Sequence, residues 1–95
     1  MIPKPKRIRD KQAVYMAQKW KCEKCHKRAY GGPHHIISVG SGGPDHPWNL
    51  IQLCGSCHTK AHTAEILRGE LWDVVAKREN MKTDDIKGKV NSMRG

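Results

Sequence analysis

The spacing of apolar residues near the N-terminus predicts a short helix. From Asp10 to Lys19, apolar side chains recur at steps of three and four residues, which is the period of an amphipathic helix. Asp10 suits the N-cap position, because its carboxylate can accept a hydrogen bond from the first helical turn. The residues expected on the apolar face are Ala13, Val14, Ala17 and Trp20.

Two apolar runs separated by a loop predict a pair of strands and then a helix. The loop is residues 40–47, GSGGPDHP, which consists almost entirely of turn-forming residues. A helix is expected to begin at Gly55 or Ser56 and to continue past His62. The apolar residues of the two strands are Ile36, Ile37 and Val39 before the loop, and Leu50, Ile51 and Leu53 after it.

A last helix is expected over residues 70–80, and both ends of the chain are polar. Residues 1–9 carry two prolines and a run of charge, which is typical of a flexible basic arm. Residues 81–95 form a polar tail with two glycines that we expect to be loosely held. One domain over residues 10–80 is therefore expected. The residues of the last helix that should face the core are Leu71, Trp72, Val74 and Val75.

The length of the chain allows one domain with a small core. Its 95 residues are 37% hydrophobic and include no phenylalanine, so we expect Trp20, Trp48 and Trp72 to be the large core residues. Chains this short bury a modest fraction of their surface, and such folds often depend on a metal or a disulfide.

Positive charge is concentrated in the first part of the chain. The net charge is +9, and residues 1–28 hold ten lysines and arginines against two acidic residues. This density favours a polyanionic partner, most simply nucleic acid, over the alternative of a solvated basic tail. No apolar run is long enough for a signal peptide or a membrane span, so we expect a soluble, cytoplasmic protein with no membrane partner.

The four cysteines form two Cys-x-x-Cys pairs, Cys22/Cys25 and Cys54/Cys57. Each tight turn of this kind offers two thiolates, and two turns complete the tetrahedral shell of a structural zinc ion. In a reducing compartment, this pattern favours zinc over disulfides. His26 follows Cys25 and is an alternative ligand, but the simpler interpretation is an exposed histidine on the turn.

Histidines gather around the second cysteine pair. His58 and His62 are four residues apart, so a helix places them on one face. Cys57 lies about 100° from His58 around the same helix, so thiolates and imidazoles can serve two different metal sites. His34 and His35 would point to opposite sides of a strand, so one can bind metal while the other faces substrate. Purely structural histidines are the alternative.

This order of residues resembles the HNH endonucleases, whose fold is the ββα-metal or His-Me finger fold. Residues 34–62, HHIISVGSGGPDHPWNLIQLCGSCHTKAH, carry the family's histidine pair, asparagine and final histidine. Colicin DNases have a nearly identical histidine set without the cysteines, whereas many phage and prophage HNH proteins carry both Cys-x-x-Cys pairs. The resemblance covers residues 20–63 and implies a small α+β, ββα-metal fold with a four-cysteine structural zinc and flanking helices.

The resemblance also implies roles for individual residues. His35 matches the general base that activates water, and His34 matches a metal ligand. Asn49 matches the asparagine that ties down the loop between the strands and orients the base. His58 matches the final motif histidine, a metal ligand that belongs with His35 and Asn49 to the catalytic set. His62 matches an additional ligand of colicin-like members, while other members use two protein ligands with phosphate and water.

The function implied by the resemblance is that of a metal-dependent DNA endonuclease or nickase leaving 5′-phosphate and 3′-hydroxyl ends. A neutral imidazole can take a proton from water near pH 7, and one divalent cation can stabilise charge on the phosphate and the leaving oxygen. Imidazole ligands suit Zn²⁺, Ni²⁺, Co²⁺ or Mn²⁺ better than Mg²⁺, which stays a candidate. No second DNA-reading domain fits in 95 residues, so we expect low sequence specificity on double-stranded DNA.

Two other functions stay open at this point. A non-catalytic zinc-binding module that binds DNA would keep the cysteines and the basic arm, but would need no particular residue at His35 or His58. An adaptor that binds protein through its zinc turns would have negligible affinity for DNA. The resemblance to small phage HNH proteins further implies a phage or prophage origin, a bacterial host cell and a DNA-packaging role beside a terminase.

Overall fold

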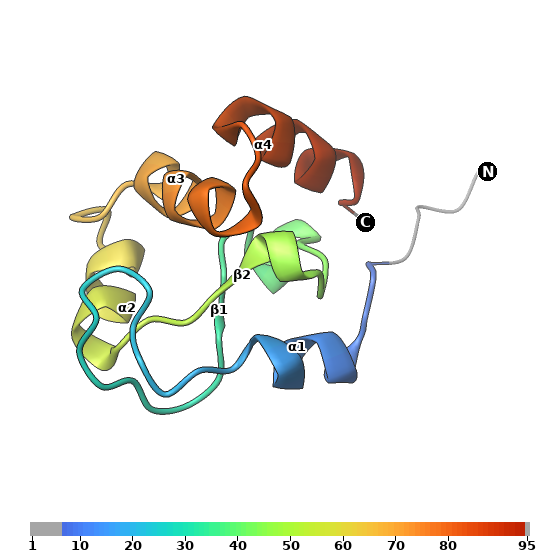
Figure 1. Ribbon diagram of the computed structural model, residues 1–95. Helices are drawn as coiled ribbons and strands as arrows, with labels where there is room; N and C mark the ends of the chain where they lie inside the picture. Colours follow the sequence, from blue (N-terminus) through green and yellow to red (C-terminus); the bar gives the residue numbers. More distant parts are fainter. Residues whose placement is uncertain (1–6, 95) are drawn as a thin grey trace.

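The computed structural model describes residues 7–94, so most of the expected basic arm, residues 1–6, lies outside the described residues. A short antiparallel hairpin forms the centre, with α1 on one side of it and α3 and α4 on the other (Figure 1). The elements in chain order are α1 (Lys11–Ala17), β1 (His34–His35), the 3-10 turns η1 (Val39–Ser41) and η2 (Pro47–Asn49), β2 (Leu50–Ile51), α2 (Gly55–His62), α3 (Arg68–Glu79) and α4 (Thr83–Ser92).

The hairpin and the helix after it form a ββα unit, which confirms the expected fold. His34 of β1 lies opposite Ile51 of β2, and His35 lies opposite Leu50. The strands are shorter than the apolar runs predict, because side-chain hydrogen bonds replace the ladder beyond Ile36. There the backbone N–H of Ile37 donates to the side-chain oxygen of Asn49 at 2.8 Å.

The first helix forms as expected but does not bury its tryptophan. Asp10 caps α1 by accepting a hydrogen bond from the Ala13 N–H at 3.1 Å. The expected apolar face is half-buried, but the prediction that Trp20 fills the core is wrong, since Trp20 is 64% exposed. The reason is local: the backbone turns extended at Gln18, so Trp20 lies beyond the helix and off its buried face.

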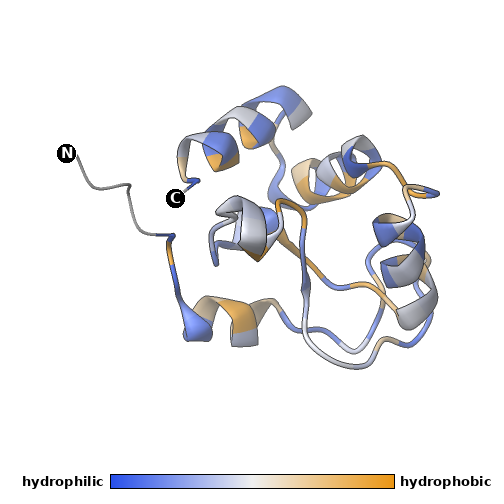
Figure 2. Ribbon diagram, turned by 180° about the vertical axis from the view of Figure 1, so that it is seen from behind, coloured by the Kyte–Doolittle hydropathy of each residue, from blue (hydrophilic) through white to orange (hydrophobic). Residues whose placement is uncertain are grey.

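The core lies between the hairpin and the last two helices. Trp72 of α3 is its largest fully buried side chain, and Trp48 packs against the same cluster while half-buried. Hydrophobic residues lie along β2, whereas α3 carries both hydrophobic and hydrophilic residues and α2 is mostly hydrophilic (Figure 2). Other buried members are Ile36, Ile37, Ile51, Leu53, Leu71, Val75, Ile86 and Val90.

The C-terminal residues differ from the loosely held tail that their polarity suggested. Residues 83–92 form α4, and its Ile86 and Val90 are fully buried in the core. These two residues are four apart, so they share one face of the helix. The negative charges of Asp84 and Asp85 in the first turn stabilise the helix by interacting with its dipole. Two apolar side chains therefore anchor a mostly polar segment in the core, and the Thr83 hydroxyl adds a hydrogen bond to Asp73 of α3 at 2.8 Å.

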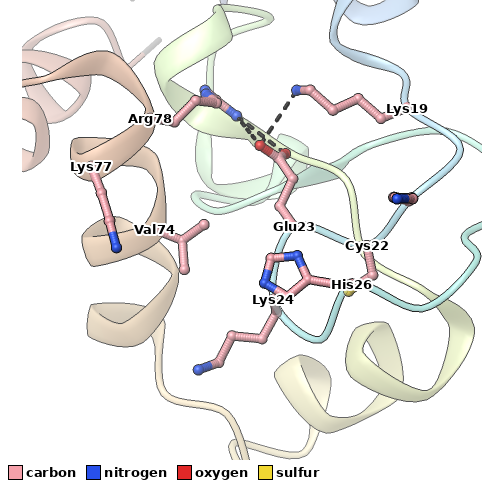
Figure 3. A pocket seen from close by; sticks show the side chains of 9 residues that line it. Lys19, Cys22, Glu23, Lys24, His26, Val74, Lys77 and Arg78 are labelled. Atoms are coloured by element: carbon pink, nitrogen blue, oxygen red, sulfur yellow. Dashed lines mark hydrogen bonds and ion pairs between the residues drawn. The ribbon is translucent and has the colours of Figure 1, made fainter.

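A half-buried ion pair connects the first cysteine turn to α3. Arg78 donates to both carboxylate oxygens of Glu23, at 2.9 and 3.2 Å, and Lys19 approaches the same carboxylate at 3.3 Å (Figure 3). Arg78 also donates to the carbonyls of Leu50 and Pro47. One guanidinium thus holds the cysteine turn, β2 and η2 in fixed relation.

None of the helices in the described part of the chain is both long and apolar enough to pass through a membrane.

Replacing Arg78 with alanine should destabilise the fold by about 2 kcal/mol, because it leaves the Glu23 carboxylate, with a side chain only 10% exposed, without its main partner. The matched control is Lys77→Ala on the exposed face of the same helix, which should cost less than about 0.5 kcal/mol. Urea unfolding of the zinc-loaded proteins followed by circular dichroism measures both. Equal midpoints for the two variants would show that this ion pair does not anchor the fold.

Candidate active site and metal centres

The two Cys-x-x-Cys pairs form tight turns whose backbone points N–H groups at sulfur. In the first turn, the Cys25 N–H donates to Cys22 Sγ at 3.4 Å, and the Cys22 N–H donates to the Lys27 carbonyl at 2.7 Å. In the second, Cys54 is the N-cap of α2, and its sulfur accepts from the Cys57 N–H at 3.5 Å. The N–H groups of Cys25 and Cys57 thus stabilise the thiolates of Cys22 and Cys54, and the thiolate is the form that binds metal.

The four sulfurs converge on one point. Their Sγ atoms all lie within 4.8 Å of one another, and those of Cys25 and Cys54 are 3.5 Å apart. A tetrahedral zinc ion with bonds of about 2.3 Å separates its sulfurs by about 3.8 Å, so the arrangement fits a zinc site with four cysteine ligands. Burial and the neighbouring sulfurs raise the pKa of Cys57 to about 12, so full deprotonation of the four thiols requires a cation among them.

His26 is not part of this cluster, in agreement with its interpretation as an exposed histidine on the turn. It is exposed, and the four thiols converge without it. Its φ of +66° is in the left-handed region, and its N–H donates to the Cys22 carbonyl at 3.0 Å, which closes the first turn. Figure 3 shows its ring in the pocket between this turn and α3, on the side where Lys24 and Lys77 also lie.

A second cluster consists of three histidines. His34 from β1 meets His58 and His62 from α2, and one ring nitrogen of each lies within 4.8 Å of the others. The Nε2 atoms of His58 and His62 are 3.1 Å apart, close to the spacing of about 3.3 Å between nitrogens on a tetrahedral ion with bonds of about 2.0 Å. The chemistry of this donor set fits a transition metal or zinc.

The electrostatics of the histidine cluster favour neutral rings. Burial, together with the neighbouring rings of His58 and His62, lowers the pKa of His34 to about 4. Burial also lowers the pKa of His58, with His62 as the second cause. Both rings therefore carry a nitrogen lone pair at neutral pH, which is what a metal ion needs.

His35 points to a different partner from its neighbour, as the alternation of a strand predicts. Its Nε2 lies 2.8 Å from Asp45 Oδ1. Arg7 Nη1 donates to the same oxygen at 2.7 Å, and the Asp10 N–H donates to Oδ2 at 2.9 Å. Partial burial raises the pKa of Asp45, but the hydrogen bonds from His35, Arg7 and Asp10 outweigh it and bring that pKa to about 2.

Asn49 ties the loop between the strands together from a fully buried position. Its side chain accepts from the Ile37 N–H at 2.8 Å and donates to the carbonyls of Ile37 and Pro44 at 3.0 and 3.1 Å. The loop also needs Gly43, since a Cβ there would lie 1.8 Å from the Ile37 carbonyl oxygen. The loop is therefore packed onto the end of β1, and it presents Asp45 to His35.

Two residues of the site were missed by sequence reasoning. Asp45 appeared as one more turn-forming residue of the loop, and its one distinguishing signal is that it is the loop's single acidic residue. Arg68, the first residue of α3, lines a cavity of about 190 Å³ together with His34, His35 and His62. Arg68 comes from outside the histidine motif, and only the packing of α3 brings it there.

Comparison with known proteins finds similarity to one protein family and to three individual proteins. Residues 22–64 match the model of the family described as HNH endonuclease. The chain is 50% identical over 34 residues to an uncharacterized 38.5 kDa protein in psbA intron 1 of Chlamydomonas moewusii. It is 40% identical over 45 residues to Anaredoxin of Nostoc sp., and 40% identical over 50 residues to the type IV methyl-directed restriction enzyme EcoKMcrA of Escherichia coli.

These matches cover 36%, 47% and 43% of this chain respectively. They span 10%, 57% and 18% of the length of the three relatives, in the same order. The likeness is therefore one of a shared domain.

The two clusters should respond differently to loss of one ligand. Cys54→Ala removes a thiolate and the N-cap of α2, so we expect loss of the bound zinc and of cooperative thermal unfolding. The matched variant His58→Ala lies on the same helix but is exposed, and it should keep the zinc and its melting temperature within a few degrees. Elemental analysis after dialysis and thermal melts check this. Loss of the structural zinc from His58→Ala would contradict two separate sites.

Proposed function

We propose that this chain, whose residues 22–64 match the HNH endonuclease family, is a metal-dependent endonuclease that hydrolyses phosphodiester bonds of DNA. The observation that carries the proposal is the convergence of His34, His58 and His62 on one point while His35 on the same strand faces Asp45. A module that only bound DNA through its zinc turns would need neither arrangement.

The proposed roles follow from where the histidine ring nitrogens lie and which residues line the cavity beside them. His34, His58 and His62 would hold the divalent cation, which supplies Lewis acidity to a phosphate oxygen and to the leaving oxygen. His35 is the proposed general base, which takes a proton from the attacking water. Arg68, on the wall of the same cavity, is positioned to contact the phosphate.

Asp45 determines which nitrogen of His35 acts. Its pKa of about 2 keeps the carboxylate ionised and able only to accept, so a neutral His35 carries its proton on Nε2, the atom 2.8 Å away. The lone pair is then on Nδ1, and Nδ1 is the proposed proton acceptor. Asp45 is thus a positioning residue, because it acts on the water through the imidazole.

Several finer features of the proposal rest on resemblance to phage and prophage HNH proteins with two Cys-x-x-Cys pairs. These features are 5′-phosphate and 3′-hydroxyl products, nicking of one strand, low sequence specificity, and a packaging role beside a terminase. The choice among Mn²⁺, Ni²⁺, Co²⁺, Zn²⁺ and Mg²⁺ rests on the donor set, in which three imidazoles favour the transition metals and zinc.

The proposed function is tested most simply with supercoiled plasmid. The zinc-loaded protein should nick it when Mn²⁺, Ni²⁺ or Mg²⁺ is added, and His35→Ala should reduce the rate at least about a hundredfold, because it removes the base. The matched control is His26→Asn, which changes an exposed histidine outside both clusters, keeps a residue that tolerates the left-handed φ, and should leave the rate unchanged. DNA binding without nicking under every metal would favour the non-catalytic module instead.

Asp45→Asn should lower kcat roughly tenfold to a hundredfold with little change in KM, because the imidazole loses the charge that fixes its tautomer. Asp45 also holds Arg7, so Arg7→Met serves as the control: it removes that ion pair and leaves the hydrogen bond to His35 in place. We expect less than about a twofold change in kcat for Arg7→Met on this reasoning. Wild-type kcat in Asp45→Asn would refute the positioning role.

A further inference from the structure

Exposed aromatic side chains gather at the end of α1 and the end of the first cysteine turn. They line one hollow of about 560 Å³ together with Met16 and Arg28. Tyr15, Trp20 and Tyr30 are 73%, 64% and 77% exposed. Single exposed apolar residues are ordinary, but several large ones around one hollow mark an interaction surface. We call Tyr15, Met16, Trp20, Arg28 and Tyr30 the aromatic surface.

The aromatic surface is a fixed unit. The Gln18 side chain donates to the Gly31 carbonyl at 3.0 Å, which ties the end of α1 to the end of the cysteine turn. The Ala29 N–H donates to the Trp20 carbonyl at 2.9 Å, next to an antiparallel β-bridge between the backbones of Lys21 and Arg28. The backbone segments that carry the rings are therefore already tied together, so binding would cost little backbone ordering.

Cations are interleaved with the rings. The Arg28 guanidinium carbon lies 5.9 Å from the centre of the Trp20 ring and 5.5 Å from that of Tyr30. Lys21 Nζ lies 5.1 Å from the Trp20 ring centre. Among the residues that line the hollow, Lys19 is paired with Glu23, and Arg28 is the cation that stands beside the rings. The surface thus combines exposed rings with the positive charges of Lys21 and Arg28.

We propose that the aromatic surface binds single-stranded DNA through stacking of unpaired bases on Trp20 and Tyr30. Rings with flanking cations are the pattern of single-strand binding surfaces, where the cations attract the phosphates and each base offers a π-face. In an intact duplex the base faces are occupied by their neighbours, so this chemistry selects unpaired nucleotides. An apolar protein partner would gain nothing from the cations.

The aromatic surface is close to the proposed catalytic centre. Tyr30 precedes His34 by four residues, and an extended chain spans at most about 3.6 Å per residue, so their Cα atoms lie within about 14 Å. This inference rests on the proposed function in one respect: unpaired bases held here would lie a few nucleotides from the phosphate at the histidine cluster. The substrate would then be DNA with a single-stranded segment beside the site of cleavage.

The test compares a labelled oligothymidylate with a blunt duplex of equal length, by fluorescence anisotropy of zinc-loaded protein without further metal. Trp20→Ala should weaken oligothymidylate binding about tenfold and duplex binding less than about twofold. Tyr30→Ala should shift binding in the same direction. The matched control is Leu67→Ala, which removes a side chain 61% exposed outside the hollow and should change neither affinity.

Two outcomes would overturn the inference. Equal weakening of both DNAs by Trp20→Ala would make the surface a general DNA contact, and no change in either would assign it to a protein partner or to none. Nicking of supercoiled plasmid by the wild type is scored separately. If the wild type nicks plasmid but Trp20→Ala binds oligothymidylate as tightly as the wild type, only the inference is wrong. If Trp20→Ala selectively loses oligothymidylate binding but the wild type does not nick plasmid, only the proposed function is wrong.

Discussion

The convergence of four thiols on one point is the constraint on which the structure depends. Cys54 and Cys57 fix where α2 begins, so they set the direction in which His58 and His62 point. The same four-thiol cluster holds the first cysteine turn against the start of α2, and that turn carries Glu23 to Arg78 on α3. In a chain of 95 residues with a small apolar core, this metal-binding cluster replaces packing that a larger domain would provide.

A second, polar network positions the chemistry. Asn49 is fully buried and forms hydrogen bonds with three backbone groups of the loop and its start, so the loop is fastened to the end of β1 and presents Asp45 to His35. Such networks are favourable only when complete, because each buried polar group without a partner costs about 1–3 kcal/mol. The catalytic proposal therefore rests on a hairpin whose strands pair over only two residues each and whose loop is held by side-chain hydrogen bonds.

Local patterns predicted most of the site, and long-range contacts account for what they missed. The apolar pattern predicted the two strands and the helix after them, and the spacing of the cysteines predicted the zinc cluster. The resemblance to HNH endonucleases implied the ββα unit and the histidine ligands. Nothing local indicated that Asp45 meets His35 or that Arg7, 38 residues away, joins them. Trp20 was misassigned because the helix ends before it, and α4 was missed because only two residues, Ile86 and Val90, form its buried face.

The central claim is that thiolates and imidazoles of one helix serve two separate metals. X-ray absorption on zinc-loaded protein supplied with one equivalent of Co²⁺ tests it most directly, because each edge reports only its own neighbours. The account predicts sulfur alone around zinc, at about 2.3 Å, and nitrogen or oxygen alone around cobalt. A mixed shell of sulfur and nitrogen at either metal would contradict it.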